Sequence, residues 1–220
     1  MEQNTKPTST SVANKQIIDA QYKQEAFQVR ERILSENNRG SMVARRLIWL
    51  LGKADFGNIR QVLDIGSWHL GQSIEFSNIF QNAKIDAFEP VPDSYQLCLQ
   101  NLNNLDNQKK NRIQIHNIAL SNKTGKVPFY SIDMSVKQKI DAGFSSLFKF
   151  NGKLKNAYYD EELVQKKIMV QADTLDNWCM KNNVNNVDII WIDVQGAELL
   201  VFCPQRVSLF ADLLASGYYS

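Results

Sequence analysis

The stretch VLDIGSWHLGQS, residues 62–73, decides the fold of this chain. Its first four residues form a nearly continuous apolar run, which is typical of a strand buried on both faces. Gly66 has no Cβ, so the chain can turn sharply there and its backbone can approach a ligand closely. Gly71 then opens a predicted helix whose N-terminal amides are partly positive. This pattern alone fits either a nucleotide-type ligand loop or a simple turn between a strand and a helix.

Strand and helix patterns alternate along the rest of the chain, which predicts an α/β fold with a mostly parallel sheet and helices on both faces. The segment from about 133 to 167 is long and irregular. The expected strands are QVLDI (61–65), KIDAFEP (84–90), RIQIHNIAL (112–120), VPFYSI (127–132), IMVQA (168–172) and VDIIWID (187–193). The expected helices cover 72–80, 92–102, 174–182, with Thr174 as a cap, and a segment beginning near 195.

The N-terminal part divides into a disordered tail (1–13) and two helices (14–57), which precede an α/β domain (58–220) within one globular unit. Apolar residues at spacings of four and three predict the first helix, which ends near Asn37, and Ser41 can cap the second. These helices either pack on the domain or form a cap over a ligand or a dimer contact. Packing is the favoured interpretation.

Composition excludes several classes of protein. The net charge of +2 and the absence of a Lys/Arg block argue against a nucleic-acid partner. Three scattered cysteines without a CxxC pair argue against a disulfide framework or a zinc site and favour a reducing, cytoplasmic setting. The acids are not clustered and the histidines lack ligand spacing, so no metal is expected. Neither an apolar signal core nor a run long enough to cross a membrane is present, and we expect no membrane partner.

Glu89 ends the strand that follows the glycine loop. A carboxylate at that position can accept hydrogen bonds from both hydroxyls of a ribose. Neither a GxGxxG nor a GxxxxGK[ST] pattern is present, so a ligand with a diphosphate or triphosphate is poorly supported. The order of strand, glycine loop, helix, strand and terminal acid therefore predicts a nucleoside site.

The motifs VLDIGSWHLGQS, FEPVPDSY, GFSSL, TLDNW and IDVQGAE together resemble the FkbM-type family of S-adenosylmethionine-dependent methyltransferases, over residues 62–202. The resemblance implies a Rossmann-like class I methyltransferase fold with S-adenosyl-L-methionine as cofactor. It also implies O-methylation of a hydroxyl on a small molecule, a sugar or glycan, or a natural product.

The resemblance also implies roles for individual residues. It assigns Asp64, Gly66 and Gly71 to the methionine side of the cofactor, Glu89 to the ribose, the adjacent Pro90 to the cofactor site, and Asn117, Ile118 and Ala119 to the adenine. It places Asp193 and Gln195 at the transferring methyl group, with Asp193 also in contact with the cofactor.

Asp193 is the first candidate for the base that takes the acceptor's proton. It could instead cap the helix that follows. His69 departs from the family pattern, and it is either a weaker candidate base or a bulky group that narrows the pocket. Ser145 and Ser146 match the family's SSL and could contact substrate or cap a turn.

The resemblance ends after Phe202, where the family continues with further strands, so we expect a C-terminally shortened domain. The strand VDIIWI would lie at a sheet edge, covered by a final helix over 207–217 or by a second copy in a homo-oligomer. The alternative is a truncated, non-catalytic binding or assembly module of the same fold. A nicotinamide-dependent oxidoreductase ranks last, because the dinucleotide glycine pattern is missing.

Overall fold

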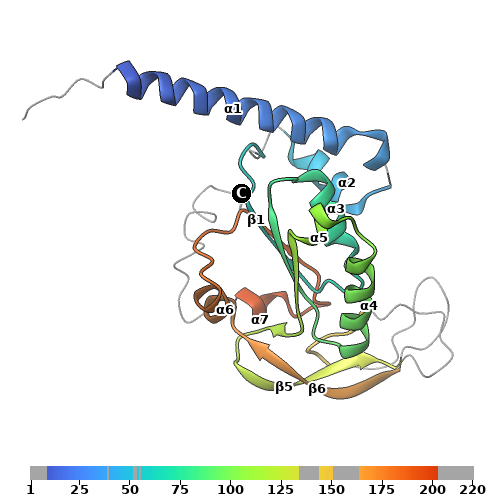
Figure 1. The fold of residues 1–220 in the computed structure, drawn as a ribbon. Helices are drawn as coiled ribbons and strands as arrows, with labels where there is room; N and C mark the ends of the chain where they lie inside the picture. The colour runs from blue at the N-terminus through green and yellow to red at the C-terminus, as the bar shows by residue number, and fades with distance from the viewer. Residues whose placement is uncertain are drawn as a thin grey trace, which may run out of the picture.

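The computed structural model describes residues 9–38, 40–51, 54, 56–133, 144–150 and 164–202 (Figure 1). Its centre is a four-stranded sheet in the order β3-β2-β1-β7, in which every neighbouring pair is parallel. The central strand β1 places Asp64 between Ala87 of β2 and Trp191 of β7. The predicted α/β fold is confirmed, with strands β1 (Gln61–Ile65), β2 (Lys84–Phe88), β3 (Ile113–His116) and β7 (Ile189–Ile192).

Helices cover both faces of this sheet because alternate strand residues are apolar on each side. On one face, Val62 and Ile85 pack in a cluster with residues of the first four α-helices; on the other, Leu63 and Ile65 pack against Trp178 of α6 and against α7. The helices on the first face are α1 (Ser9–Leu34), α2 (Met42–Leu50), α3 (Gly71–Ile79) and α4 (Pro92–Asn103), and those on the second are α6 (Leu175–Lys181) and α7 (Glu198–Phe202). A 3-10 turn, η1 (Glu36–Asn38), and a short helix, α5 (Asn107–Lys110), complete the helical elements.

The N-terminal helices pack on the domain, as the favoured interpretation predicted. Val29 and Ile33 of α1 and Leu47 of α2 are buried in the same cluster as the sheet. Ser41 caps α2, since its Oγ accepts from the Ala44 amide at 2.8 Å. Helix α1 begins at Ser9, earlier than expected, because the residues before Ile18 carry no apolar pattern that would reveal a helix. The domain boundaries at 13 and 57 stay predictions.

A smaller second sheet lies at the carboxyl end of the main one (Figure 1). It has the order β4-β6-β5 and consists of β4 (Ala119–Leu120), β5 (Gly125–Ile132) and β6 (Gln165–Asp173). The prediction of one continuous strand over RIQIHNIAL is therefore wrong. The chain leaves the main sheet after His116, and Ala119 pairs instead with Ala172 of β6. This break lets β4 and its sheet cover the ends of the parallel strands.

Strand β7 pairs only with β1 among the residues that the structure describes. The helix predicted over 207–217, and Cys203, lie outside those residues. None of the described helices is both long and apolar enough to cross a bilayer.

Candidate active site

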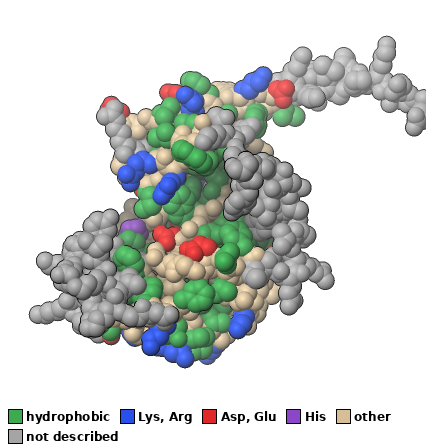
Figure 2. Space-filling view, turned by 180° about the vertical axis from the view of Figure 1, so that it is seen from behind, with side chains coloured by type: hydrophobic (Ala, Val, Ile, Leu, Met, Phe, Trp, Pro, Cys, Tyr) green, Lys and Arg blue, Asp and Glu red, His purple; other side chains and the backbone are tan. Residues whose placement is uncertain are grey.

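A hollow opens between the ends of β1, β2 and β7 and the second sheet. It contains about 510 Å³ of space free of atoms, part of which is open to solvent. Figure 2 shows one face of the molecule, on which acidic side chains lie among apolar ones in a hollowed area. The lining comes from five places: the glycine loop (Ile65, Gly66, Trp68), the end of β2 (Phe88, Glu89, Pro90), residues 118–120, the residues after β7 (Asp193, Val194), and a cover of Phe129, Ser145 and Leu147.

Gly66 lies where the ends of β1 and β7 come closest. Its φ of +92° belongs to the region that favours glycine, and a Cβ there would overlap the carbonyl oxygen of Asp193. The Gly66 amide donates to the Phe88 carbonyl at 3.0 Å, which fixes the turn against β2. The residue must therefore be glycine for the two strand ends to approach each other at the hollow.

The loop after Gly66 holds an uncommon backbone conformation. Trp68 and Leu70 have φ values of +46° and +73°, which cost energy for residues with side chains. Several hydrogen bonds hold it: the Trp68 amide donates to Glu89 Oε2 at 2.8 Å, Cys98 Sγ donates to the Trp68 carbonyl at 3.1 Å, and Asn101 Nδ2 donates to the His69 carbonyl at 2.8 Å. The wall of the hollow is thus fixed in advance of any ligand.

Glu89 is 5% exposed and presents its carboxylate to the hollow. Each oxygen accepts one backbone amide at 2.8 Å, Oε1 from Val91 and Oε2 from Trp68. Burial is the main cause that raises the pKa of this carboxyl, and the charge of Asp64 acts in the same direction; against the lowering effect of the two amides, the pKa rises from 4.5 to about 7. Because a carboxylate oxygen can accept more than one hydrogen bond, each can still accept from a ligand hydroxyl.

Asp64 lies under the loop, fully buried, and does not line the hollow. Its Oδ2 accepts from Ser73 Oγ at 2.5 Å, whereas its Oδ1 is buried without a hydrogen-bond partner. Burial raises the pKa of Asp64 to about 6 against the effect of hydrogen bonds from Ser73 and Ser67, and the charge of Asp193 raises it too. A buried acid with an unsatisfied oxygen favours a positive charge nearby.

Asp193 follows β7 at the exposed rim of the hollow. Its Oδ1 accepts from Gln195 Nε2 at 2.7 Å, and partial burial raises the pKa of the carboxyl. Helix α7 begins only at Glu198, and the Asp193 side chain bonds to Gln195 rather than to an amide of that helix. The alternative role as a helix cap therefore has no hydrogen bond to support it.

The structure brings together some of the predicted site residues but not others. Gly66, Glu89, Pro90, Ile118, Ala119 and Asp193 line the hollow. Asp64, His69, Gly71, Asn117 and Gln195 do not, and their predicted roles toward a cofactor or substrate stay predictions.

Some of the predicted residues that do not line the hollow have a structural role beside it. The His69 ring stacks on Trp68, with centroids 3.9 Å apart, and a Cβ at Gly71 would come within 2.6 Å of that ring. Gly71 therefore makes room for His69. Asn117 donates from Nδ2 to the backbone carbonyl of Glu89 at 2.8 Å, so it helps to fix the backbone that carries this acid.

Trp68, Phe129, Leu147 and Val194 line the hollow without having been predicted to do so. Trp68 could have been inferred from its position between the two loop glycines. Phe129 carries no motif and reaches the site only through strand β5 of the second sheet, whereas Leu147 ends the GFSSL motif but was not assigned a role. Of the two serines, Ser145 lines the hollow, while Ser146 is buried and its Oγ lies 3.0 Å from the Gln195 carbonyl oxygen.

The charges of the hollow are one-sided. Glu89 and Asp193 are acidic, and no Lys, Arg or His is present among its described lining residues. Among the parts of the chain that the structure describes, no group of three or more His, Cys, Asp or Glu is placed to hold a metal ion.

Comparison with known proteins identifies the family of this chain. The model of the methyltransferase FkbM domain matches residues 54–211, which include every strand of both sheets. The chain belongs to the FkbM methyltransferase family. This FkbM chain is similar to the 2-O-methyltransferase NoeI of Sinorhizobium fredii (strain NBRC 101917 / NGR234), with 28% identity over 172 residues. The alignment covers 76% of this chain and 64% of the length of the relative, and no solved structure matches.

Proposed function

We propose that this FkbM protein is an S-adenosylmethionine-dependent methyltransferase that methylates a hydroxyl of a small molecule, a sugar or glycan, or a natural product. The observation that carries the proposal is the position of Glu89. Its carboxylate is buried, faces the hollow beside Gly66, and is oriented by the two amides of Trp68 and Val91. A carboxylate held in this way can accept both hydroxyls of a ribose.

The other residues fit the rest of such a cofactor. Ile118 and Ala119 offer an apolar wall for a base, and Gly66 leaves room for a close approach. A sulfonium carries a positive charge, which suits a hollow with two acids, no cationic lining residue described, and the unsatisfied Oδ1 of Asp64 beneath it.

The cofactor would supply a methyl group activated by the sulfonium. The chain would contribute alignment of that group with the acceptor oxygen, which is the main requirement of a displacement at carbon. Asp193 would take the proton of the acceptor hydroxyl on its carboxylate, and its raised pKa makes it a better base than an ordinary aspartate. Gln195 would hold that carboxylate in place through its 2.7 Å hydrogen bond.

Calorimetry with S-adenosylhomocysteine tests the proposal. We expect binding to the wild-type chain and a loss of about a hundredfold or more in Glu89→Ala, because hydrogen bonds to a charged acceptor contribute about 1.5–3 kcal/mol each. Glu31→Ala, on the exposed surface of α1, is the control and should bind like wild type. Absence of binding to the folded wild-type protein would overturn the proposal.

A further inference from the structure

A second hollow lies at the opposite end of the main sheet, where strands β2 and β3 begin. It contains about 920 Å³ of space free of atoms, partly open to solvent, between the end of α1, the end of α3 and α5. All its described lining side chains are polar and none is acidic. Three of them are cations (Arg32, Lys109, Arg112), and amides including Asn78, Gln81 and Gln108 lie beside them. We call this the basic hollow.

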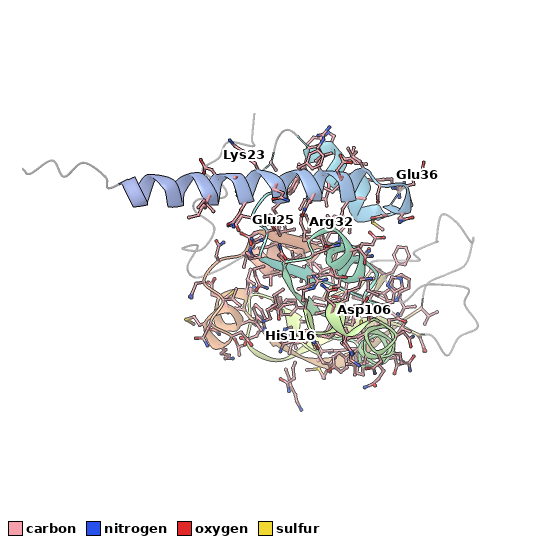
Figure 3. All side chains as sticks on the ribbon, turned by 45° about the horizontal axis from the view of Figure 1, so that its top comes forward. Lys23, Glu25, Arg32, Glu36, Asp106 and His116 are labelled. Carbon is pink, nitrogen blue, oxygen red and sulfur yellow. The ribbon has the colours of Figure 1, made fainter. Side chains whose placement is uncertain are left out.

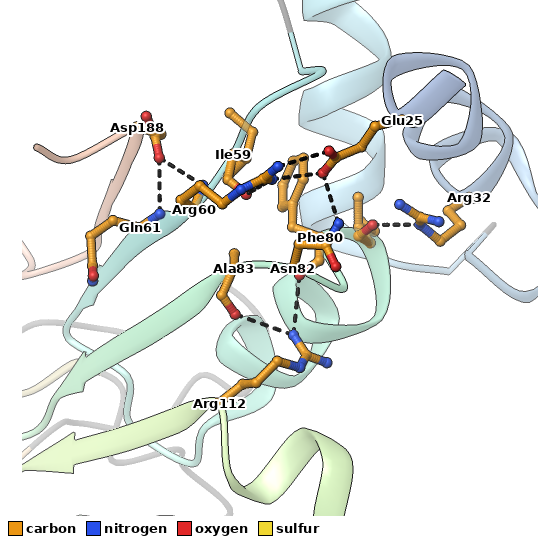
Figure 4. A network of polar contacts seen from close by, with 11 residues as sticks. Glu25, Arg32, Ile59, Arg60, Gln61, Phe80, Asn82, Ala83, Arg112 and Asp188 are labelled. Carbon is orange, nitrogen blue, oxygen red and sulfur yellow. Dashed lines mark hydrogen bonds and ion pairs between the residues drawn. The ribbon is translucent and has the colours of Figure 1, made fainter. Parts of the chain in front are cut away.

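The two arginines are held at the C-terminal end of α3 (Figure 4). Arg32 Nε donates to the Ile79 carbonyl at 2.6 Å, and Arg112 Nη1 donates to the carbonyls of Phe80 and Ala83 at 3.1 and 3.3 Å. Arg112 Nη2 donates to the Ser77 carbonyl at 2.9 Å. These carbonyl oxygens satisfy hydrogen bonds but carry no full negative charge, so the guanidinium charges are fixed in place without being cancelled by them.

Burial disfavours these charges. It lowers the pKa of both guanidinium groups, and the Nε of Arg112 is buried without a hydrogen-bond partner. A bound anion would compensate for this loss of solvation, and guanidinium groups are well suited to phosphate and sulfate.

Acids do lie near the basic hollow: against the effect of burial, the charges of Glu25 and Asp106 raise the pKa of Arg32 and Arg112, respectively, and Glu36 stands in the chain between the lining residues Ser35 and Asn37. Both oxygens of Glu25 accept from Arg60, at 2.7 and 2.9 Å (Figure 4). Asp106 pairs with Lys109 at 3.4 Å on the surface of the molecule, where Figure 3 labels it away from Glu25. Exposed pairs of this kind are weak, so a dianion can replace Asp106 as the partner of Lys109.

We propose that the basic hollow binds a phosphate or sulfate ester carried by a hydroxyl-rich molecule, such as a sugar phosphate. Arg32, Arg112 and Lys109 bind the anion, and the amides of Asn78, Gln81 and Gln108 bind the hydroxyls. Since its walls come from α1, α3 and α5, a bound ligand joins the N-terminal helix to the sheet. The basic hollow is separate from the hollow at the ends of β1, β2 and β7, and this proposal does not depend on the function proposed there.

The test compares glucose 6-phosphate, inorganic phosphate, sulfate and glucose in calorimetry and thermal unfolding of the full chain, at one ionic strength balanced with sodium chloride. We expect glucose 6-phosphate to bind most tightly and to raise the unfolding temperature, and glucose alone to bind most weakly.

Gln81→Glu adds an acid to the basic hollow and Lys109→Gln removes a cation, and neither variant removes a hydrogen bond at the end of α3. Each should weaken binding by about tenfold, the effect of one added or lost unit charge a few ångströms from the ligand at a protein surface. The matched controls are Gln171→Glu and Lys126→Gln, both exposed on the second sheet, which should bind like wild type. Equal affinity in Gln81→Glu and Gln171→Glu, or no binding to wild type beyond that of chloride, would overturn the proposal.

Discussion

Replacing Glu89 with glutamine should destabilise the protein at acid pH and stabilise it at alkaline pH. Burial raises the pKa of Glu89 from an ordinary 4.5 to about 7. The native state therefore holds this proton more tightly than the unfolded chain does. The contribution of the group to stability is fully present below pH 4.5 and is lost as the pH rises through 7.

The pKa difference sets the size of the effect. A rise from 4.5 to about 7 corresponds to about 3 kcal/mol of unfolding free energy lost by wild type across this range, at about 1.4 kcal/mol per pH unit. Glutamine cannot ionise and escapes this loss. However, the NH₂ group of glutamine cannot accept a hydrogen bond, so the backbone amide of either Trp68 or Val91, which donates to the carboxylate in wild type, loses its partner. A hydrogen bond left unmade costs about 1–3 kcal/mol.

The assay is urea unfolding of wild type and Glu89→Gln at pH 5 and pH 8, without ligand. We expect the variant to be less stable than wild type at pH 5 and more stable at pH 8, with a swing of about 3 kcal/mol between the two differences. Glu31→Gln is the control for introducing an amide at an exposed site. A swing of zero would show that Glu89 is not a buried acid at the hollow, and the reasoning would be refuted.

Four further predictions concern the same site. The affinity for S-adenosylhomocysteine should rise as the pH passes from 6 to 8, because the ionised Glu89 accepts both ribose hydroxyls; calorimetry that shows a flat profile would contradict this. Asp64→Asn removes a buried charge and should lower the affinity for S-adenosylmethionine relative to S-adenosylhomocysteine by about fivefold to tenfold, as measured by competition; an unchanged ratio would count against it. Gly66→Ala should lower the unfolding free energy by about 3 kcal/mol or more, because strain and overlap with a carbonyl add, whereas Gly125→Ala, at a φ of +108° in open space, should lose about 1–2 kcal/mol in the same urea titration. Asp193→Asn should reduce kcat by about a hundredfold to ten-thousandfold, as expected for loss of a base, while the affinity for S-adenosylhomocysteine, which carries no sulfonium charge, stays unchanged; normal turnover would remove Asp193 from that role.

The main sheet could be predicted from the sequence because parallel strands buried on both faces leave continuous apolar runs, as in VLDI and DIIWI. The caps Ser41 and Thr174 were predictable for a local reason, since each accepts an amide three residues ahead. The division of 112–120 into two strands was not. Asn117 carries no clear breaking signal, and only the pairing of β4 with the distant β6 reveals it.

The candidate site shows the same division between local and distant information. Gly66 and Glu89 could be predicted because each stands at the end of a strand, where ligands of α/β sheets bind. Phe129 could not, because it reaches the hollow only through strand β5 of the second sheet. Leu147 ends the GFSSL motif, but its place at the hollow depends on the pairing of Ser146 with the distant Tyr130. The stacking of His69 on Trp68 over Gly71 depends on positive φ angles that no propensity predicts.

The most direct test of the central claim is a crystal structure of the chain with S-adenosylhomocysteine. The account predicts that both ribose hydroxyls lie within hydrogen-bond distance of the Glu89 carboxylate, with the adenine against Ile118 and Ala119. A ligand bound elsewhere, or a Glu89 carboxylate turned away from the ribose, would contradict it.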